Sequence, residues 1–109
     1  MPFPPPRVHS ISRAAAAAMT RRYRAAPDKG PQLAFMFPRD VYERLLAQPG
    51  CAGIRAYEAL DEKGERQAVL VGVDKNGDDM MDGMLFDLSF PCPPYCGGGG
   101  GDGGDGLAG

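Results

Sequence analysis

The residues best suited to chemistry are three cysteines, Cys51, Cys92 and Cys96. Cys92 and Cys96 are four positions apart with Pro93 and Pro94 between them, so a tight turn could bring their sulfur atoms within disulfide distance. Redox-active pairs typically need a thiolate activated by a helix N-terminus or a nearby cation, and here prolines follow Cys92. We therefore expect either a structural or regulatory disulfide or two free thiols packed in a closing turn, rather than a catalytic centre.

Metal binding is a second use for the same thiols. A structural zinc site commonly takes four Cys or His ligands, and the chain offers its three cysteines and a single histidine, His9, in a proline-flanked segment. Cys51, Cys92 and Cys96 would need a water or a carboxylate to complete such a site. Cys51 fits better as a small buried residue at the entrance of a strand. We expect no metal ion and no other cofactor.

Residues 74–79 place oxygen ligands at alternate positions, as a calcium loop does. The EF-hand pattern fails, because its sixth position is Asp79 where glycine is required and its twelfth is Leu85 where a bidentate glutamate is required. A Ser or Cys nucleophile would lack a general base, since the single histidine, His9, lies in a proline-flanked segment. The chain also contains no phosphate loop and no dinucleotide fingerprint. The sequence therefore predicts a protein that is not an enzyme.

Basic residues gather in the first half of the chain. Residues 1–50 carry eight Arg or Lys against three Asp or Glu, a net charge of +5, whereas residues 51–109 carry four against eleven, a net charge of −7. A basic helix is typical of nucleic-acid binding, but a slightly acidic chain without an aromatic platform argues against that partner. Another protein, or a second copy with its acidic hairpin ends, is the better partner. The interaction candidates are Arg13, Arg21, Arg22 and Arg24.

Local patterns predict the elements of the first half. A helix is expected over residues 10–26, because a serine can cap its start, a run of alanines favours it and Pro27 ends it. Residues 32–37 alternate as a short strand does, and Pro38 opens a second helix over residues 38–48. The first helix should carry one apolar stripe, formed by Ile11, Ala15, Met19 and Tyr23.

The stretch from Gly53 to Asp79 should form the centre of the fold. Residues 54–60 and 66–74 are expected strands, joined by a turn whose glycine can take a positive φ. The second of these strands is apolar on both faces, so we expect it to be central and covered on each side. Asn76-Gly77 predicts another hairpin, and a third strand is clearest over residues 84–90, with prolines ending the sheet.

These elements predict an α+β fold, in which an N-terminal helix, a short strand and a second helix pack on an antiparallel meander of three to four strands. Residues 1–9 should be a Pro-rich disordered arm, residues 10–96 a single domain, and residues 97–109 a Gly/Asp-rich disordered tail. No apolar run is long enough to cross a membrane, and three cysteines without an export signal predict a cytoplasmic protein.

Several short motifs occur together in this chain. They are Arg22-Tyr23-Arg24, the segment Leu45–Tyr57, the segment Val69–Asp74 with Gly77 and Asp79, and Cys92–Cys96. Their order, GIRxY, LVGVDxxGxD and CPPxC, resembles that of a group of small uncharacterised bacterial proteins. The resemblance covers residues 10–96 and implies one compact domain closed by the cysteine motif. It implies no activity and no functional residue.

The sequence therefore predicts a small non-enzymatic module that interacts with another protein or assembles with copies of itself. The basic first helix and the acidic hairpin ends could pair between subunits. Two alternatives stay open. One is a thiol-dependent function, a disulfide or a metal site, at Cys92 and Cys96. The other is nucleic-acid binding through the arginine-rich helix.

Overall fold

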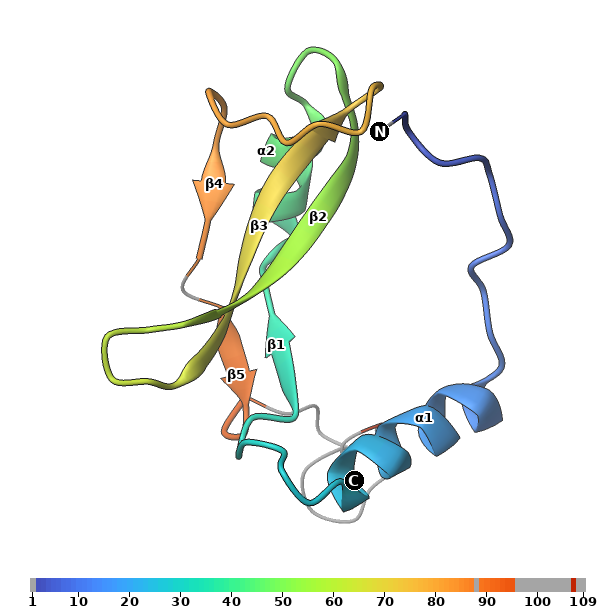
Figure 1. The fold of residues 1–109 in the computed structure, drawn as a ribbon, viewed down its shortest axis with the longest axis vertical. Coiled ribbons are helices and arrows are strands. Elements are labelled where there is room, and N and C mark those ends of the chain that lie inside the picture. The colour runs from blue at the N-terminus through green and yellow to red at the C-terminus, as the bar shows by residue number, and fades with distance from the viewer. Residues whose placement is uncertain (1, 88, 96–106, 108–109) are drawn as a thin grey trace. The chain divides into compact units, whose positions relative to one another are not determined.

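The computed structural model in Figure 1 describes residues 2–87, 89–95 and 107. Within them the chain forms two helices and five strands, and all of the strand pairs are antiparallel. The fold is therefore α+β with a β-meander, as the sequence predicts. The chain divides into two compact units, the first made of Met1–Pro6 and Phe37–Ser89 and the second of Arg7–Met36 and Phe90–Gly109. The predicted boundaries of a single domain at residues 10–96 stay a prediction.

The first unit is built on a three-stranded sheet with the order β2-β3-β4. Its strands are β2 (Cys51–Leu60), β3 (Arg66–Asp74) and β4 (Leu85–Phe86), and helix α2 (Arg39–Leu46) lies against β2 and β3 (Figure 1). The strand that is apolar on both faces, β3, is the central one. The prediction of a central position for residues 66–74 is confirmed.

The core lies between α2 and one face of this sheet. Leu45 of α2 is 0% exposed and packs with Leu70 of β3 in a cluster that also contains Phe37 and Val41. Because side chains alternate along a strand, Val71 lies on the opposite face, and it is only 1% exposed. Both faces of β3 are therefore covered.

Two turns of the same construction bound β3. Each begins with an aspartate, Asp61 or Asp74. The backbone N–H of this aspartate donates to the backbone carbonyl four residues later, and its backbone carbonyl accepts from the N–H of the glycine three residues later. Each carboxylate also accepts two backbone N–H groups of its own turn. Gly64 and Gly77 have φ angles of 80° and 85°, which only glycine adopts readily. The bulged turn predicted at Gly64 is confirmed, and the second turn is of the same bulged kind rather than a two-residue Asn-Gly turn.

The side chain of Gln48 holds the end of α2 to the loop that precedes β4. Its Nε2 donates to the Leu45 carbonyl at 3.0 Å, and its Oε1 accepts the Met84 N–H at 3.0 Å. Two glycines make room for this amide. A Cβ at Gly72 would lie 2.8 Å from Nε2, and a Cβ at Gly83 would overlap Oε1. A side chain at either position would therefore displace the Gln48 amide from its place against the backbone.

The second unit holds helix α1 (Arg13–Ala25), whose first turn is capped by Ser12 accepting the Ala15 N–H. The capping that the sequence predicts is confirmed. The helix has no buried residue, and the expected apolar stripe includes Ile11 and Met19, which are 60% and 57% exposed. The helix is therefore formed as predicted, but three residues of its apolar stripe are exposed and only Tyr23 is half-buried.

The same unit contains a two-stranded sheet, in which β1 (Ala34–Met36) pairs with β5 (Phe90–Cys92). The strand expected over residues 84–90 is thus divided, because β4 pairs with β3 while β5 pairs with β1. Pro91 lies inside β5, opposite Phe35, and does not end the sheet as expected. In a two-stranded sheet each strand has a free edge, so a proline without an N–H is tolerated there.

Candidate interaction surface

The outer edge of β2 carries backbone groups that have no partner among the described residues. Paired residues of antiparallel strands alternate between hydrogen-bonded and non-bonded pairs. The Asp61 N–H bonds the Glu65 carbonyl at 2.9 Å, so odd-numbered residues of β2 bond β3 and even-numbered ones point away from it. The Met80 N–H bonds the Gly72 carbonyl at 2.8 Å, which fits this alternation, because Gly72 lies opposite Ile54 and directs its carbonyl away from β2. The groups that face outward belong to Ile54, Ala56 and Glu58, which we call the open edge.

The open edge is long, and the N-terminal arm lies beside only the first half of β2. β2 runs for ten residues and contains no proline, whereas the strand at the other side of the same sheet, β4, has two residues. A register shift between Cys51 and Gly53 distorts only the N-terminal end of β2. Proteins commonly shorten, bulge or cover such edges because they pair readily with other strands. The open edge is therefore the feature of this unit that is best suited to bind another chain.

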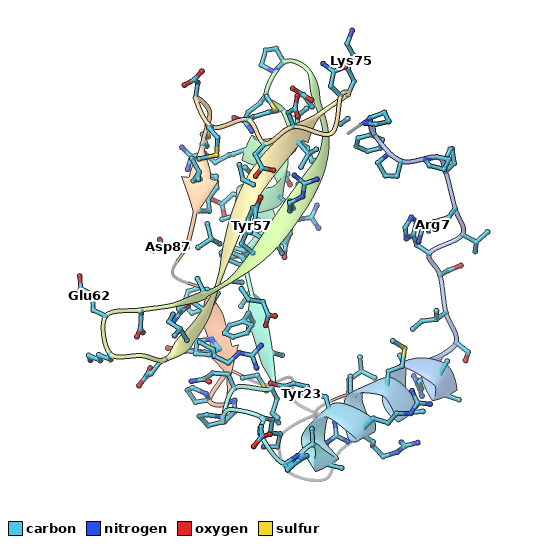
Figure 2. The ribbon with its side chains drawn as sticks, in the orientation of Figure 1. Arg7, Tyr23, Tyr57, Glu62, Lys75 and Asp87 are labelled. Carbon is cyan, nitrogen blue, oxygen red and sulfur yellow. The ribbon has the colours of Figure 1, made fainter. Side chains whose placement is uncertain are left out.

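A polar cluster covers the sheet face opposite α2. Arg55 and Tyr57, which share this face of β2, both donate to the carboxylate of Asp79. Asp79 pairs with Val73 from the other side of β3, so these contacts cross β3 and shield its valines. Figure 2 labels Tyr57 on the sheet of the first unit. The cluster explains why Val71 is buried on the face opposite α2.

These contacts shift the ionisation of all three groups. The hydrogen bond from the Tyr57 hydroxyl, followed by that from Arg55, holds the pKa of Asp79 below its usual value despite the opposing effect of desolvation. The bond to Asp79 raises the pKa of Tyr57 and of Arg55. At neutral pH the cluster is therefore held as a carboxylate, a neutral phenol and a guanidinium.

The Asp79→Asn change should make stability depend less on pH. Because the pKa of Asp79 is lower in the folded chain than its ordinary value of about 3.9, its ionised form stabilises the fold above that value, and this contribution is lost as the pH falls through the folded pKa. Wild type should therefore exceed the variant in free energy of unfolding by its largest amount above about pH 5, and this difference should disappear in acid. Urea titrations across this range measure it. The Asp82→Asn change, at an exposed carboxylate nearby, is the control, and an equal pH dependence in both variants would contradict the assignment.

The N-terminal arm lies beside the first half of β2. The Phe3 ring is 3.5 Å from the position that a Cβ of Gly53 would take, and a hollow of about 380 Å³ is lined by Phe3, Pro4, Val73 and residues 53–56. Among the described residues, no backbone hydrogen bond joins the arm to β2. The arm therefore rests against the sheet without pairing with the open edge.

The β2–β3 turn carries acidic groups around a second hollow of about 480 Å³. Figure 2 shows Glu62 at the tip of this hairpin. Four of the six lining residues are acidic, so the expected acidic hairpin end is present. The lining residues are Leu60, Asp61, Glu62, Lys63, Glu65 and Asp87.

Two of the cysteines that the sequence singles out belong to different units. Cys51 is a free thiol in the first unit, half-buried, and its Sγ donates to the Gly53 carbonyl at 3.2 Å. Cys92, in β5 of the second unit, is 4% exposed and disulfide-bonded. Cys96, the expected partner, lies outside the described residues, so that pairing stays a prediction. Among the described residues, no group of three or more His, Cys, Asp or Glu side chains is placed to hold a metal ion.

The arginine candidates all lie on α1. Arg13, Arg21 and Arg22 are exposed, whereas Arg24 is half-buried and donates to the carbonyl of Leu107. The helix contains no acidic residue. The charged residues of α1 are therefore all basic.

No protein-family model matches this chain, and no curated protein or solved structure is significantly similar to it. In the described part of the chain, neither helix is long and apolar enough to cross a bilayer. The case for a function therefore rests on the surfaces described above.

Sequence reasoning missed the open edge and the polar cluster. Arg55 and Tyr57 are two positions apart in an expected strand, which places them on one face. Their partner Asp79 is more than twenty residues away and is revealed only by the pairing of Val73 with Asp79. The edge position of β2 likewise depends on the strand order, for which the chain offers no local signal.

Proposed function

We propose that the protein is a non-enzymatic interaction module that binds an extended segment of another chain along the open edge of β2. The observation that carries this proposal is a ten-residue edge strand with outward backbone groups at Ile54, Ala56 and Glu58. Adding a strand to such an edge is a common way for a domain to recognise a partner, since main-chain hydrogen bonds supply affinity and alternate side chains supply specificity. Arg55, Tyr57 and the acidic turn would supply that specificity here.

A thiol-dependent function is the second candidate, because Cys92 is disulfide-bonded. Its near-complete burial in β5 suits a structural link better than an exchange reaction, which needs access to the sulfur. Nucleic-acid binding through α1 is the third candidate. It is supported by the exposed arginines at positions 13, 21 and 22, and such binding would weaken steeply as the salt concentration rises.

Ala56→Pro should weaken binding without unfolding the protein. The Ala56 N–H points away from β3, so proline removes a donor from the open edge and leaves the β2–β3 hydrogen bonds intact. We expect the dissociation constant for the bound chain, or for self-association, to rise about tenfold or more, while the free energy of unfolding changes by about 1 kcal/mol or less. Sedimentation velocity and quantitative retention on the immobilised full chain measure the binding, and urea unfolding measures the stability.

Ala59→Pro is the matched control, because the same substitution on the same strand removes an N–H that bonds β3 opposite Gln67. It should lower the free energy of unfolding by about 1–3 kcal/mol. If Ala56→Pro self-associates as wild type does and retains the same partners to the same extent, the open edge does not bind other chains and the proposal fails.

A further inference from the structure

We infer that the open edge of β2 is occupied by β2 of a second copy of this chain, antiparallel to the first and related to it by a two-fold axis at Ala56. This inference rests on the proposed function, because it uses the same edge, and it adds the identity of the partner and the register. Pairing through β2 would join two three-stranded sheets into one sheet of six strands.

The direction of the backbone groups limits the possible registers. In an antiparallel pair, residues that face each other must lie on the same side of the sheet, and outward groups must meet outward groups. An axis at Arg55, Ala56 or Tyr57 satisfies both conditions near the middle of the strand. An axis at Arg55 would place two guanidinium groups directly opposite each other, which is destabilising. An axis at Tyr57 would shorten the overlap, since β2 ends at Leu60.

The Ala56 register makes the side chains complementary. It places Arg55 of each copy opposite Tyr57 of the other, so that a guanidinium meets an aromatic ring whose hydroxyl is bonded to a carboxylate, Asp79. On the other face it places Glu58 opposite Ile54, so no like charges face each other. The small side chain of Ala56 lies at the axis, where the two strands approach most symmetrically.

The N-terminal arm is compatible with this pairing. Its Phe3 ring lies beside Gly53, and the hollow that it lines reaches Ile54 and Ala56, but in the described residues it bonds none of the outward backbone groups of β2. Pro2, Pro4, Pro5 and Pro6 lack an N–H and could not continue the ladder themselves. In the Ala56 register Gly53 faces Ala59 of the second copy, so Phe3 lies beside the end of the added strand and extends the contact.

Disulfide trapping tests the register in the full-length chain. Two cysteines that face each other at the axis fall within the Cα separation of a disulfide. The Ala56→Cys protein should form a covalent dimer under mild oxidation, whereas Glu58→Cys, which faces Ile54, should not. Wild type, with Cys51 half-buried, is the blank. Sedimentation equilibrium should show a wild-type dimer whose dissociation constant rises about tenfold or more in Ala56→Pro.

The alternatives give distinct results. Trapping through Arg55→Cys or Tyr57→Cys, with none through Ala56→Cys, would overturn the register. A chain that stays monomeric at every concentration, but retains a partner that Ala56→Pro loses, would overturn self-pairing while the proposed function stands. A dimer unaffected by Ala56→Pro would overturn self-pairing through this edge, and if the variant also retains every partner that wild type retains, it would overturn both.

Discussion

The Val71→Asp protein should be unfolded at neutral pH. Val71 is 1% exposed on the central strand and lies beneath the contacts from Arg55 and Tyr57 to Asp79. The new carboxylate would be buried close to the like charge of Asp79, which already holds the opposite residue, Arg55. Leaving an uncompensated charge buried costs about 3–5 kcal/mol. That cost is comparable to the whole stability of many small domains. Circular dichroism and urea unfolding of the purified chain measure the effect.

Leu85→Asp is the control for this prediction. Leu85 pairs directly with Val71 across β3 and β4 and therefore shares its face, but it is 46% exposed. A carboxylate there stays in water, and the free energy of unfolding should fall by about 1 kcal/mol or less. A soluble Val71→Asp protein that unfolds cooperatively at the wild-type urea concentration would show that β3 is not the centre of the core.

Gly83→Ala should destabilise the protein through Gln48. The added methyl group would overlap Oε1, and the backbone carbonyl oxygen of Met80 lies only 3.2 Å from the position of that methyl group. The amide would have to leave, which breaks its bonds to Met84 and Leu45. We expect a loss of about 1–3 kcal/mol in the free energy of unfolding, measured by urea titration.

A double-mutant cycle separates this cause from a general intolerance of alanine. Once Gly83→Ala has displaced the amide, Gln48→Ala should cost almost nothing more, so the two losses should not add. Gly53→Ala is the matched control, because its methyl group would only touch the Phe3 ring at 3.5 Å and should leave stability within about 1 kcal/mol of wild type. Additive losses at Gly83 and Gln48 would refute the mechanism.

Much of the fold could be predicted because its signals are local. The bulged turn at Gly64 and the two-faced apolar pattern of β3 lie within a few residues of the structure that they determine. The division of residues 84–90 could not be predicted in this way. Leu85 and Phe90 belong to one continuous alternating pattern, but Leu85 pairs with β3 and Phe90 with β1, more than fifty residues earlier. Pairing between distant segments is not encoded in the pattern of either segment.

The candidate surface was less predictable than the fold. Arg55, Tyr57 and Asp79 are ordinary polar residues of strands and turns until the register brings them together. Gly72 was the one available signal for the Gln48 contact, because an isolated glycine inside a strand often marks a close approach of another group. The arginines of α1 were correctly placed on a helix, but whether they bind anything stays a prediction.

The two aspartate turns also bear on how the meander assembles during folding. Each is held by hydrogen bonds between residues at most four positions apart, and each joins β3 to a segment that is adjacent in the chain. Closing short loops costs little chain entropy, and such local contacts favour fast folding. Because β3 belongs to both hairpins, the order in which the hairpins form need not be unique, and the central strand is recruited whichever turn closes first.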